Sequence, residues 1–513
     1  MLTAADTLIA TAQAGGLDIC FANPGTTEMP LVVALERARG VRAVLGLHEN
    51  VCTGAADGYA RVAGKPAATL LHLGPGYANG LANLHNARRA RSAIVNLIGE
   101  HASWHIAADA PLTMDIEAVA GSVSALVRRV GSPEDSGPAM AESWQAATAR
   151  RGAIASLICP HDHQTAPGGP PAAVAPGLPL DAWDATGLAA AVEALRSGEP
   201  AVLFLGGTAL YGDGLAAASR IARRSGCALL AELGFAKMES GSGLPPVLRL
   251  PYFPEVAAAA LARYRHVILV GAKPPVSFFG YPDKPARYLE GREGVIQLVG
   301  QDGDAAAALA ALAAELGARE LWAQPAEPLG LPPDGPLDAA AICGVLAALQ
   351  PRDAIVIPTA VTSAQPYAPL ACRSAPHLQL VLTGGAIGEG PALAAGAALA
   401  APGRKVINLE ADGSAAYLPQ ALWTQAREGL DVVTIICSNG RYRILRLELE
   451  RAGIAAGPVA TALTGLDNPR LDWLAIAGGF GVPASRAATV DELARALGRA
   501  LAEPGPALIE AML

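Results

Sequence analysis

Short apolar runs that end in glycine alternate along this chain with Ala- and Leu-rich segments that contain charged residues at intervals. The apolar runs have the length of strands, and the Ala-rich segments have the length of helices. In the first third, strands are expected within 16–25, 41–50, 67–76 and 92–101, and helices over 50–64 and 77–90. This strand, turn and helix alternation predicts a parallel, doubly wound α/β sheet.

The same alternation returns twice after Pro- and Gly-rich stretches at 166–179 and 323–336. Such stretches are typical of linkers between domains. Further strands are expected within 200–207, 227–233, 265–275, 353–360, 378–388, 405–414, 431–440 and 506–513. The pattern therefore predicts three α/β domains, over residues 1–165, 180–322 and 337–513.

Composition narrows the class of protein. The chain has 513 residues, of which 52% are hydrophobic and 16% charged, enough apolar surface for several cores. The net charge is −8, and no basic face of the kind that binds nucleic acid is evident. Seven well-separated cysteines without a CxxC pair indicate neither a disulfide framework nor a zinc site. With no leader-like start and no long apolar span, we expect a cytoplasmic protein without membrane contact.

The most informative segments are Glu410–Ser414 and Ile435–Gly440, each of which follows an apolar run. Asp412 and Asn439 lie 27 residues apart, about one helix plus one strand, so both side chains are expected at neighbouring strand ends. A carboxylate and an amide oxygen are ligands that Mg²⁺ prefers, and phosphate oxygens could complete its coordination. Gly413 allows close approach of the backbone, and Ser414 can help to bind an anion. The alternative is two ordinary turns.

These residues carry a family resemblance. The two segments resemble the fingerprint of thiamine diphosphate (ThDP) enzymes, GDG followed by NN, with Ala411 and Ser438 as departures. The resemblance implies metal binding by Asp412, Asn439 and the carbonyl of Arg441. Ala411 is expected to be tolerated if its φ is negative, and Ser438 could weaken a supporting contact.

Other motifs follow in the order of that family. Asn23–Glu28 resembles the first loop of the benzoylformate decarboxylase and acetolactate synthase group, His48–Asn50 with the helix after it resembles the segment that activates the cofactor, and Thr383–Gly388 resembles the loop beneath the cofactor. The similarity covers essentially the whole chain. It implies ThDP-type pyrimidine-binding, central and diphosphate-binding domains, with ThDP and Mg²⁺ as cofactors.

The resemblance also implies roles for single residues. Glu49 would hydrogen-bond the aminopyrimidine ring and promote its imino tautomer, which requires a raised carboxyl pKa. Ile387 would press the bent cofactor together, and the carbonyl of Gly385 would accept a hydrogen bond from its amino group. A surface glutamate and simple core packing of Ile387 are the alternatives. The further cofactor contacts that the resemblance implies are Ala360, Val361, Gly413, Ser414, Tyr417 and Tyr442, of which the two tyrosines could be structural.

Two residues bear on the substrate. His72 stands where benzoylformate decarboxylase has an active-site histidine and could relay a proton, or it could be a loop histidine without that role. Thr26 matches the serine of that decarboxylase and could hold a substrate carboxylate. The second histidine of the decarboxylase has no counterpart in 274–279.

We therefore expect an enzyme that decarboxylates a small 2-oxo acid of the pyruvate type and then ligates the product to a second carbonyl, as in acetolactate synthases. The first alternative is a benzoylformate-type decarboxylase that releases an aldehyde. A ThDP-binding protein without activity and an NAD-dependent α/β enzyme are alternatives of other classes, and nothing in the sequence requires FAD. The resemblance implies a homodimer or homotetramer whose active sites lie between subunits.

Overall fold

The computed structural model describes residues 2–322 and 329–513, so part of the expected linker at 323–336 lies outside the described residues. The chain divides into two compact units. Unit 1 contains the described residues within 1–179, 357–363 and 384–513, and unit 2 contains those within 180–356 and 364–383. Residues 337–356 and 364–383 thus group with the central segment, while the expected domain boundaries stay predictions.

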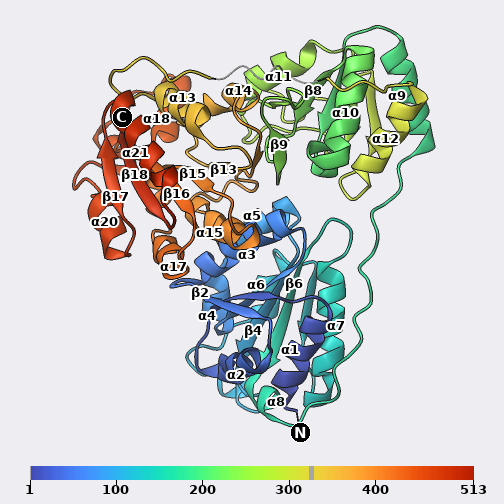
Figure 1. Ribbon diagram of the computed structural model, residues 1–513. Coiled ribbons are helices and arrows are strands. Elements are labelled where there is room, and N and C mark those ends of the chain that lie inside the picture. Colours follow the sequence, from blue (N-terminus) through green and yellow to red (C-terminus); the bar gives the residue numbers. More distant parts are fainter. Residues whose placement is uncertain (1, 323–328) are drawn as a thin grey trace. The chain divides into compact units, whose positions relative to one another are not determined.

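The N-terminal part of unit 1 is a parallel sheet in the order β2-β1-β3-β4-β6-β5 (Figure 1). Its strands are β1 (Ile19–Asn23), β2 (Arg42–Leu45), β3 (Ala67–Leu71), β4 (Ile94–Glu100), β5 (Leu126–Arg129) and β6 (Ile154–Pro160). Its helices and 3₁₀ turns are α1 (Ala4–Ala14), η1 (Thr26–Glu28), α2 (Met29–Arg37), α3 (Glu49–Ala63), α4 (Leu73–Asn79), α5 (Leu81–Ala90), η2 (Ile106–Ala108), α6 (Ile116–Gly121), η3 (Pro133–Asp135), α7 (Ser136–Ala147) and α8 (His161–Thr165).

Alternation along β1 explains why helices cover both faces of this sheet. Cys20 and Ala22 point into a core formed with α1, α2 and α7. Phe21 points the opposite way, because successive strand residues face opposite sides, and its ring meets Tyr59 of α3 at 6.3 Å. The sheet is therefore doubly wound, as the sequence predicts.

The C-terminal part of unit 1 contains parallel strands in the order β17-β18-β16-β15. These strands are β15 (Val406–Ala411), β16 (Val432–Ser438), β17 (Ala484–Ala487) and β18 (Ala507–Met512). Its helices are α15 (Gly390–Ala400), α16 (Asp412–Ala415), α17 (Ala421–Arg427), α18 (Arg443–Arg451), α19 (Pro458–Thr464), α20 (Trp473–Gly479) and α21 (Val490–Ala502). Strand β13 (Ile355–Pro358) crosses the boundary between the units.

The two parts of unit 1 meet where α3 crosses α15 (Figure 1). Small residues allow the helix backbones to touch at this crossing. A Cβ on Gly58 would overlap the carbonyl oxygen of Leu393, and one on Gly396 would overlap that of Ala55. Because a carbonyl cannot move aside without distorting its helix, glycine is required at both positions.

Unit 2 holds a parallel sheet in the order β10-β8-β7-β11-β12. Its strands are β7 (Ala201–Leu205), β8 (Ala228–Ala231), β9 (Met238–Ser240), β10 (Leu248–Arg249), β11 (His266–Val270), β12 (Val295–Val299) and β14 (His377–Gln379). Strand β9 lies outside this sheet and pairs antiparallel with β14, which in turn pairs parallel with β13. Its helices and turn are α9 (Ala185–Arg196), η4 (Gly207–Leu210), α10 (Gly212–Ser225), α11 (Pro254–Ala262), α12 (Ala305–Glu315), α13 (Ala339–Leu349) and α14 (Tyr367–Ala371). Helices α9, α10 and α12 cover one face and α11 covers the other.

Some expected elements are wrong in detail. The single helix expected over 77–90 is two helices, α4 and α5, which meet at Gly80. The strand expected within 378–388 is confined to His377–Gln379, and the rest is a loop with two glycines at positive φ. Among the described helices, none is both long and apolar enough to cross a membrane.

Candidate active site

Two strand ends bring the first loop and His72 together. Strand β1 ends at Asn23, directly opposite Leu71 at the end of β3. Thr26 follows β1 at the start of η1 and is exposed, whereas His72 follows β3 and is half-buried. Both residues therefore lie at the carboxyl edge of the sheet, where α/β proteins place their ligands.

Glu28 holds the ring of His72. The side chain of Glu28 is fully buried, and its Oε2 lies 2.7 Å from Nδ1 of His72. The same carboxylate accepts hydrogen bonds from the backbone N–H of Gly25 at 2.8 Å and from the hydroxyl of Thr27 at 2.8 Å. Because both oxygens of this side chain already act as acceptors, Nδ1 of His72 is placed as the donor to Glu28, and Nε2 is the ring nitrogen left for other chemistry.

Glu49 is the first residue of α3, which follows β2. Its side chain is buried, with 8% of the residue exposed. Asn79 of α4 donates a hydrogen bond to Oε2 of Glu49 at 3.0 Å. A Cβ on Gly76 would stand 2.8 Å from Oε1, so the glycine makes room for this carboxylate. The carboxyl group thus has one fixed donor and a second oxygen beside α4.

The C-terminal part of unit 1 contributes an oxygen-rich strand edge. Ala411 at the end of β15 pairs with Cys437 of β16, so Asp412 and Asn439 follow neighbouring strands. Asp412 is buried, and its two oxygens accept backbone N–H groups from Gly413 at 2.8 Å and Gly440 at 2.7 Å. Burial raises the pKa of Asp412, and these N–H donors oppose that rise.

Asn439 and Arg441 complete this edge. The side-chain oxygen of Asn439 accepts the backbone N–H of Arg441 at 3.0 Å, and the side chain of Arg441 is exposed. One carboxylate, one amide and the Arg441 carbonyl are hard oxygen ligands suited to Mg²⁺. In the described part of the chain, no group of three or more His, Cys, Asp or Glu side chains lies close enough to hold a metal ion.

Both departures from the family fingerprint have a structural account. Ala411 has a φ of −86°, so the condition under which alanine is expected to be tolerated is met. Ser438 donates a hydrogen bond to the buried Glu510 at 2.9 Å, and Arg470 contacts the Ser438 hydroxyl at 3.3 Å. Ser438 thus belongs to a hydrogen-bonded network with the charged residues Glu510 and Arg470.

The turn after β13 shows backbone strain. Val361 has a φ of +45° and is 36% exposed, while Ala360 is buried. A β-branched residue in this region is rare, because its side chain crowds its own backbone, and such strain is concentrated at ligand-binding sites. Behind the turn, the Thr359 hydroxyl donates to Glu410 at 2.8 Å, and burial raises the pKa of Glu410 to about 8.

Two glycines shape the loop before α15. Gly385 and Gly388 have φ values of +82° and +94°, and Ile387 between them is half-buried. A Cβ on Gly388 would stand 2.5 Å from that of Tyr417, which is 58% exposed. Gly413 makes a similar close approach to the ring of Tyr442, at 2.6 Å for an added Cβ, next to the buried Ser414. Tyr417 therefore packs closely against Gly388, and Tyr442 packs closely against Gly413.

Sequence reasoning missed several participating residues. Glu28, Asn79 and Glu410 have no expected role, although each lies in or beside a motif that the sequence singles out. An acidic residue two positions after Thr26 was the available signal for Glu28. Nothing in the local sequence shows that Glu28 meets a histidine 44 residues further on.

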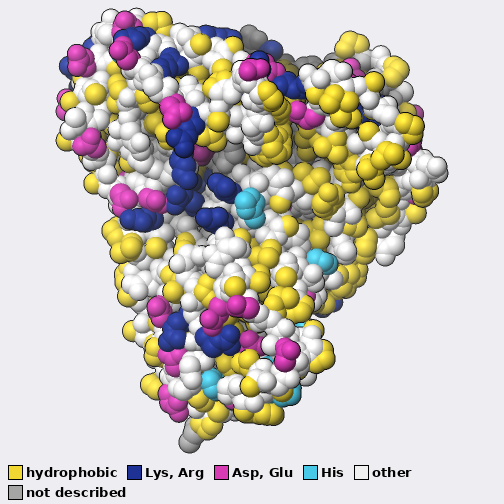
Figure 2. Space-filling view, turned by 180° about the vertical axis from the view of Figure 1, so that it is seen from behind, with side chains coloured by type: hydrophobic (Ala, Val, Ile, Leu, Met, Phe, Trp, Pro, Cys, Tyr) yellow, Lys and Arg dark blue, Asp and Glu magenta, His cyan; other side chains and the backbone are white. Residues whose placement is uncertain are grey.

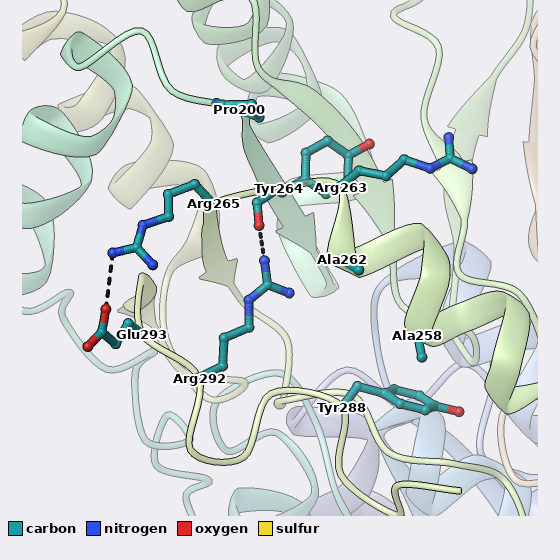
Figure 3. A pocket seen from close by; sticks show the side chains of 9 residues that line it. All are labelled: Pro200, Ala258, Ala262, Arg263, Tyr264, Arg265, Tyr288, Arg292 and Glu293. Atoms are coloured by element: carbon teal, nitrogen blue, oxygen red, sulfur yellow. Dashed lines mark hydrogen bonds and ion pairs between the residues drawn. The ribbon is translucent and has the colours of Figure 1, made fainter.

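A separate cavity of about 600 Å³ lies in unit 2 (Figure 3). Its lining includes Pro200, Arg265 and Glu293, which precede β7, β11 and β12, so it opens at the amino ends of the strands. Arg265 is paired with Glu293 at 3.1 Å, and Arg292 donates to the carbonyl of Tyr264. Ligands of α/β sheets bind at the opposite edge, so we assign no cofactor to this cavity.

Comparison with known proteins identifies the family in which this arrangement of residues at the strand ends is found. Residues 2–119 match the model of the thiamine pyrophosphate enzyme N-terminal TPP binding domain, and residues 361–511 match that of the C-terminal TPP binding domain. A Mycobacterium tuberculosis (strain ATCC 25618 / H37Rv) protein, provisionally named acetolactate synthase large subunit IlvX, is 48% identical over 100% of this chain and 99% of its own. The chain belongs to the thiamine diphosphate-dependent enzymes. The family resemblance inferred from the sequence is confirmed.

Further relatives of this ThDP enzyme are decarboxylases. Benzoylformate decarboxylase of Pseudomonas aeruginosa (strain PAO1) is 32% identical over 96% of both chains. The structure of a Rhodococcus jostii RHA1 ThDP-dependent 4-hydroxybenzoylformate decarboxylase superposes with a TM-score of 0.84, at 25% identity, over 99% of each chain. These similarities confirm an α/β ThDP-enzyme fold and an enzyme of the decarboxylase and synthase group.

The residues present suit the cofactor. The buried Glu49 is a carboxylate with one fixed donor, as a partner for a ring nitrogen requires. The strained turn at Val361 and the close approach at Gly413 leave backbone groups that could bind a charged tail.

Proposed function

We propose that this ThDP enzyme decarboxylates a small 2-oxo acid with the help of Mg²⁺, and that proton delivery by His72 releases the product as an aldehyde. The observation that carries the proposal is the His72 ring, held through Nδ1 by the buried Glu28 so that Nε2 is presented at the carboxyl edge of the sheet. The names of two relatives, a benzoylformate and a 4-hydroxybenzoylformate decarboxylase, support the same reaction class.

ThDP, when bound, supplies the electron sink that allows CO₂ to leave a 2-oxo acid. In this proposal Glu49 would hydrogen-bond the ring of the cofactor and favour its reactive tautomer. Gly385 contributes its carbonyl, and Ile387 contributes bulk beneath the cofactor. Asp412, Asn439 and the Arg441 carbonyl would hold Mg²⁺, while the turn at Ala360 and Val361 and the residues Ser414, Tyr417 and Tyr442 would surround the diphosphate.

His72 and Thr26 act on the substrate side. The exposed hydroxyl of Thr26 can donate to the substrate carboxylate. With both ring nitrogens protonated, His72 would donate the Nε2 proton to the substrate carbon, while Glu28 would keep the proton on Nδ1 hydrogen-bonded. After the transfer, His72 regains its proton from solvent, to which a quarter of its side chain is exposed.

Carboligation is the second candidate, and it is favoured by the relative named as an acetolactate synthase large subunit. It shares every step up to the loss of CO₂. Purified protein incubated with ThDP, Mg²⁺ and a panel of 2-oxo acids, with products identified by mass spectrometry, tests both. Aldehydes as the main products support the proposal, and acetolactate-type products support ligation. Stoichiometric ThDP binding without CO₂ release would indicate a silent binding protein.

Magnesium dependence is tested by removing the metal. Exhaustive EDTA treatment should abolish turnover, and added Mg²⁺ should restore it, because the ligand set contains only oxygen. An Asp412→Asn variant should need far more Mg²⁺ for half-maximal activity. Full activity without any divalent ion would contradict the metal assignment.

We further propose that the active enzyme is a homodimer or homotetramer in which Glu49 and Asp412 of one site come from different chains. Hydrophobic side chains are exposed on the face shown in Figure 2, and among the exposed large hydrophobic residues Trp104, in the N-terminal part of unit 1, is 75% exposed. Co-expression of Glu49→Gln and Asp412→Asn chains tests the arrangement. The co-expressed sample would regain about a quarter of the wild-type activity, because about half of the dimers are mixed and each mixed dimer has one intact site of two. No recovery would place each site within one chain.

A further inference from the structure

The loop that carries Gly385 and Ile387 is held by a helix of the other part of unit 1. Helix α5 presents His85 and Asn86 to this loop. Nε2 of His85 lies 3.1 Å from the carbonyl oxygen of Gly384. Asn86 donates from Nδ2 to the carbonyl of Ala386 at 2.9 Å and accepts the N–H of the same residue at 3.2 Å. About 300 residues of chain separate the partners in each contact.

The side-chain amide of Asn86 bonds to the backbone of Ala386 through both its donor and its acceptor, as one peptide group bonds to another. Its amide satisfies both the donor and the acceptor of Ala386, and Asn86 itself is fully buried. Alanine at position 86 would leave both backbone groups without this partner, so two hydrogen bonds to the loop would be lost. Gly384 permits the approach, because an added Cβ would stand 2.6 Å from the side-chain oxygen of Asn86.

The end of the loop is tied to α3 as well. Glu389 follows the loop, is fully buried and lies 3.9 Å from the guanidinium of Arg61. Arg61 also pairs with Asp57 on the same helix. Burial and the neighbouring Asp57 carboxylate raise the pKa of Glu389 well above its usual value. Both ends of the loop therefore rest on helices of the N-terminal part, α5 and α3.

We infer that Asn86, assisted by His85, is a positioning residue that fixes where the backbone of the loop 384–388 lies relative to the cofactor site. Ala386 lies between Gly385 and Ile387, the residues to which the proposed function gives direct cofactor contacts. A shift of Ala386 moves both, so a side chain that contacts neither cofactor nor substrate governs how the bent cofactor is held. This inference rests on the proposed function for its consequence in catalysis, but not for the contact itself.

Hydrogen–deuterium exchange on the protein without cofactor tests the contact directly. In Asn86→Ala, exchange of peptides that cover 384–388 should accelerate about tenfold or more, as expected for two lost hydrogen bonds. Asn83→Ala is the matched control, because Asn83 is a fully buried asparagine of the same helix that bonds Asn50 instead. His85→Ala should give a smaller acceleration in the same peptides and serves if Asn86→Ala does not fold.

Kinetics separate positioning from general stability. In Asn86→Ala, kcat should fall about tenfold or more, while the ThDP concentration for half-maximal activity changes less than about threefold, because the diphosphate end stays intact. Unchanged loop exchange in Asn86→Ala, or equal effects of Asn83→Ala, would overturn the inference. A wild-type protein that does not decarboxylate any 2-oxo acid would refute the proposed function instead, and the exchange data would still decide the contact.

Discussion

Replacement of Glu49 by glutamine perturbs the group on which the proposed reaction depends most. Glu49 is buried, and among the described residues the amide of Asn79 donates to its Oε2 at 3.0 Å. The carbonyl oxygen of glutamine can accept the same hydrogen bond at nearly the same volume. The fold and ThDP binding should therefore change little, while the variant loses a group that can hold and release a proton.

The size of the effect follows from that loss. General acid–base groups contribute about 10²–10⁴-fold to rate, which corresponds to about 3–5 kcal/mol of transition-state stabilisation. We expect kcat of Glu49→Gln to fall in this range, with the Kd for ThDP within about threefold of wild type. Aldehyde formation coupled to an alcohol dehydrogenase measures kcat, and fluorescence titration of the protein without cofactor measures the Kd.

The control is Glu36→Gln, which removes an exposed carboxylate from α2 and should leave both quantities unchanged. A kcat of Glu49→Gln within about threefold of wild type would remove Glu49 from the mechanism. A large loss of ThDP affinity with kcat preserved at saturation would show that Glu49 acts in binding rather than in activation.

Three further results are expected. His72→Ala should lower aldehyde release by about 10²-fold or more and spare ligation to an added acceptor aldehyde, and equal loss of both products would exclude the proton relay. Gly58→Ala should destabilise the protein to urea by about 1–3 kcal/mol because its Cβ overlaps the Leu393 carbonyl, whereas Gly498→Ala on the open face of α21 should stabilise it by up to about 1 kcal/mol. Burial lowers the pKa of His377 to about 4, so the unfolded chain binds the proton more readily and stability should fall by up to about 3 kcal/mol from pH 6.5 to pH 4. His377→Gln should lose less stability over that range in urea titrations, and an identical loss would exclude this histidine as the cause.

Much of the fold could be predicted because it depends on local pattern. The apolar runs that end in glycine became β1, β3, β15 and β16, and the spacing of Asp412 and Asn439 placed them after neighbouring strands. The break at Gly80 and the loop within 378–388 were not foreseen. In both places the residues suit a regular element, and the tertiary surroundings decide against it.

The pairing of residues across the chain was beyond local pattern. Glu28 meets His72 because β1 and β3 are neighbours, and Asn86 meets Ala386 because α5 packs beside the loop before α15. A single sequence carries no record of which distant segments touch. The same limit applies to Ser438, whose effect depends on Glu510 and Arg470 from other elements.

Order and spacing of short motifs were enough to assign this chain to the ThDP enzymes, because strand ends and glycine turns are encoded within a few residues of one another. Only the tertiary structure decided how the reactive groups are held. The buried Glu28 determines which nitrogen of His72 is available, and the buried amide of Asn86 bonds to the loop that contains Gly385 and Ile387. The physical reason is that a hydrogen bond between buried groups depends on where two distant backbones meet, and that position is a property of the packed core as a whole.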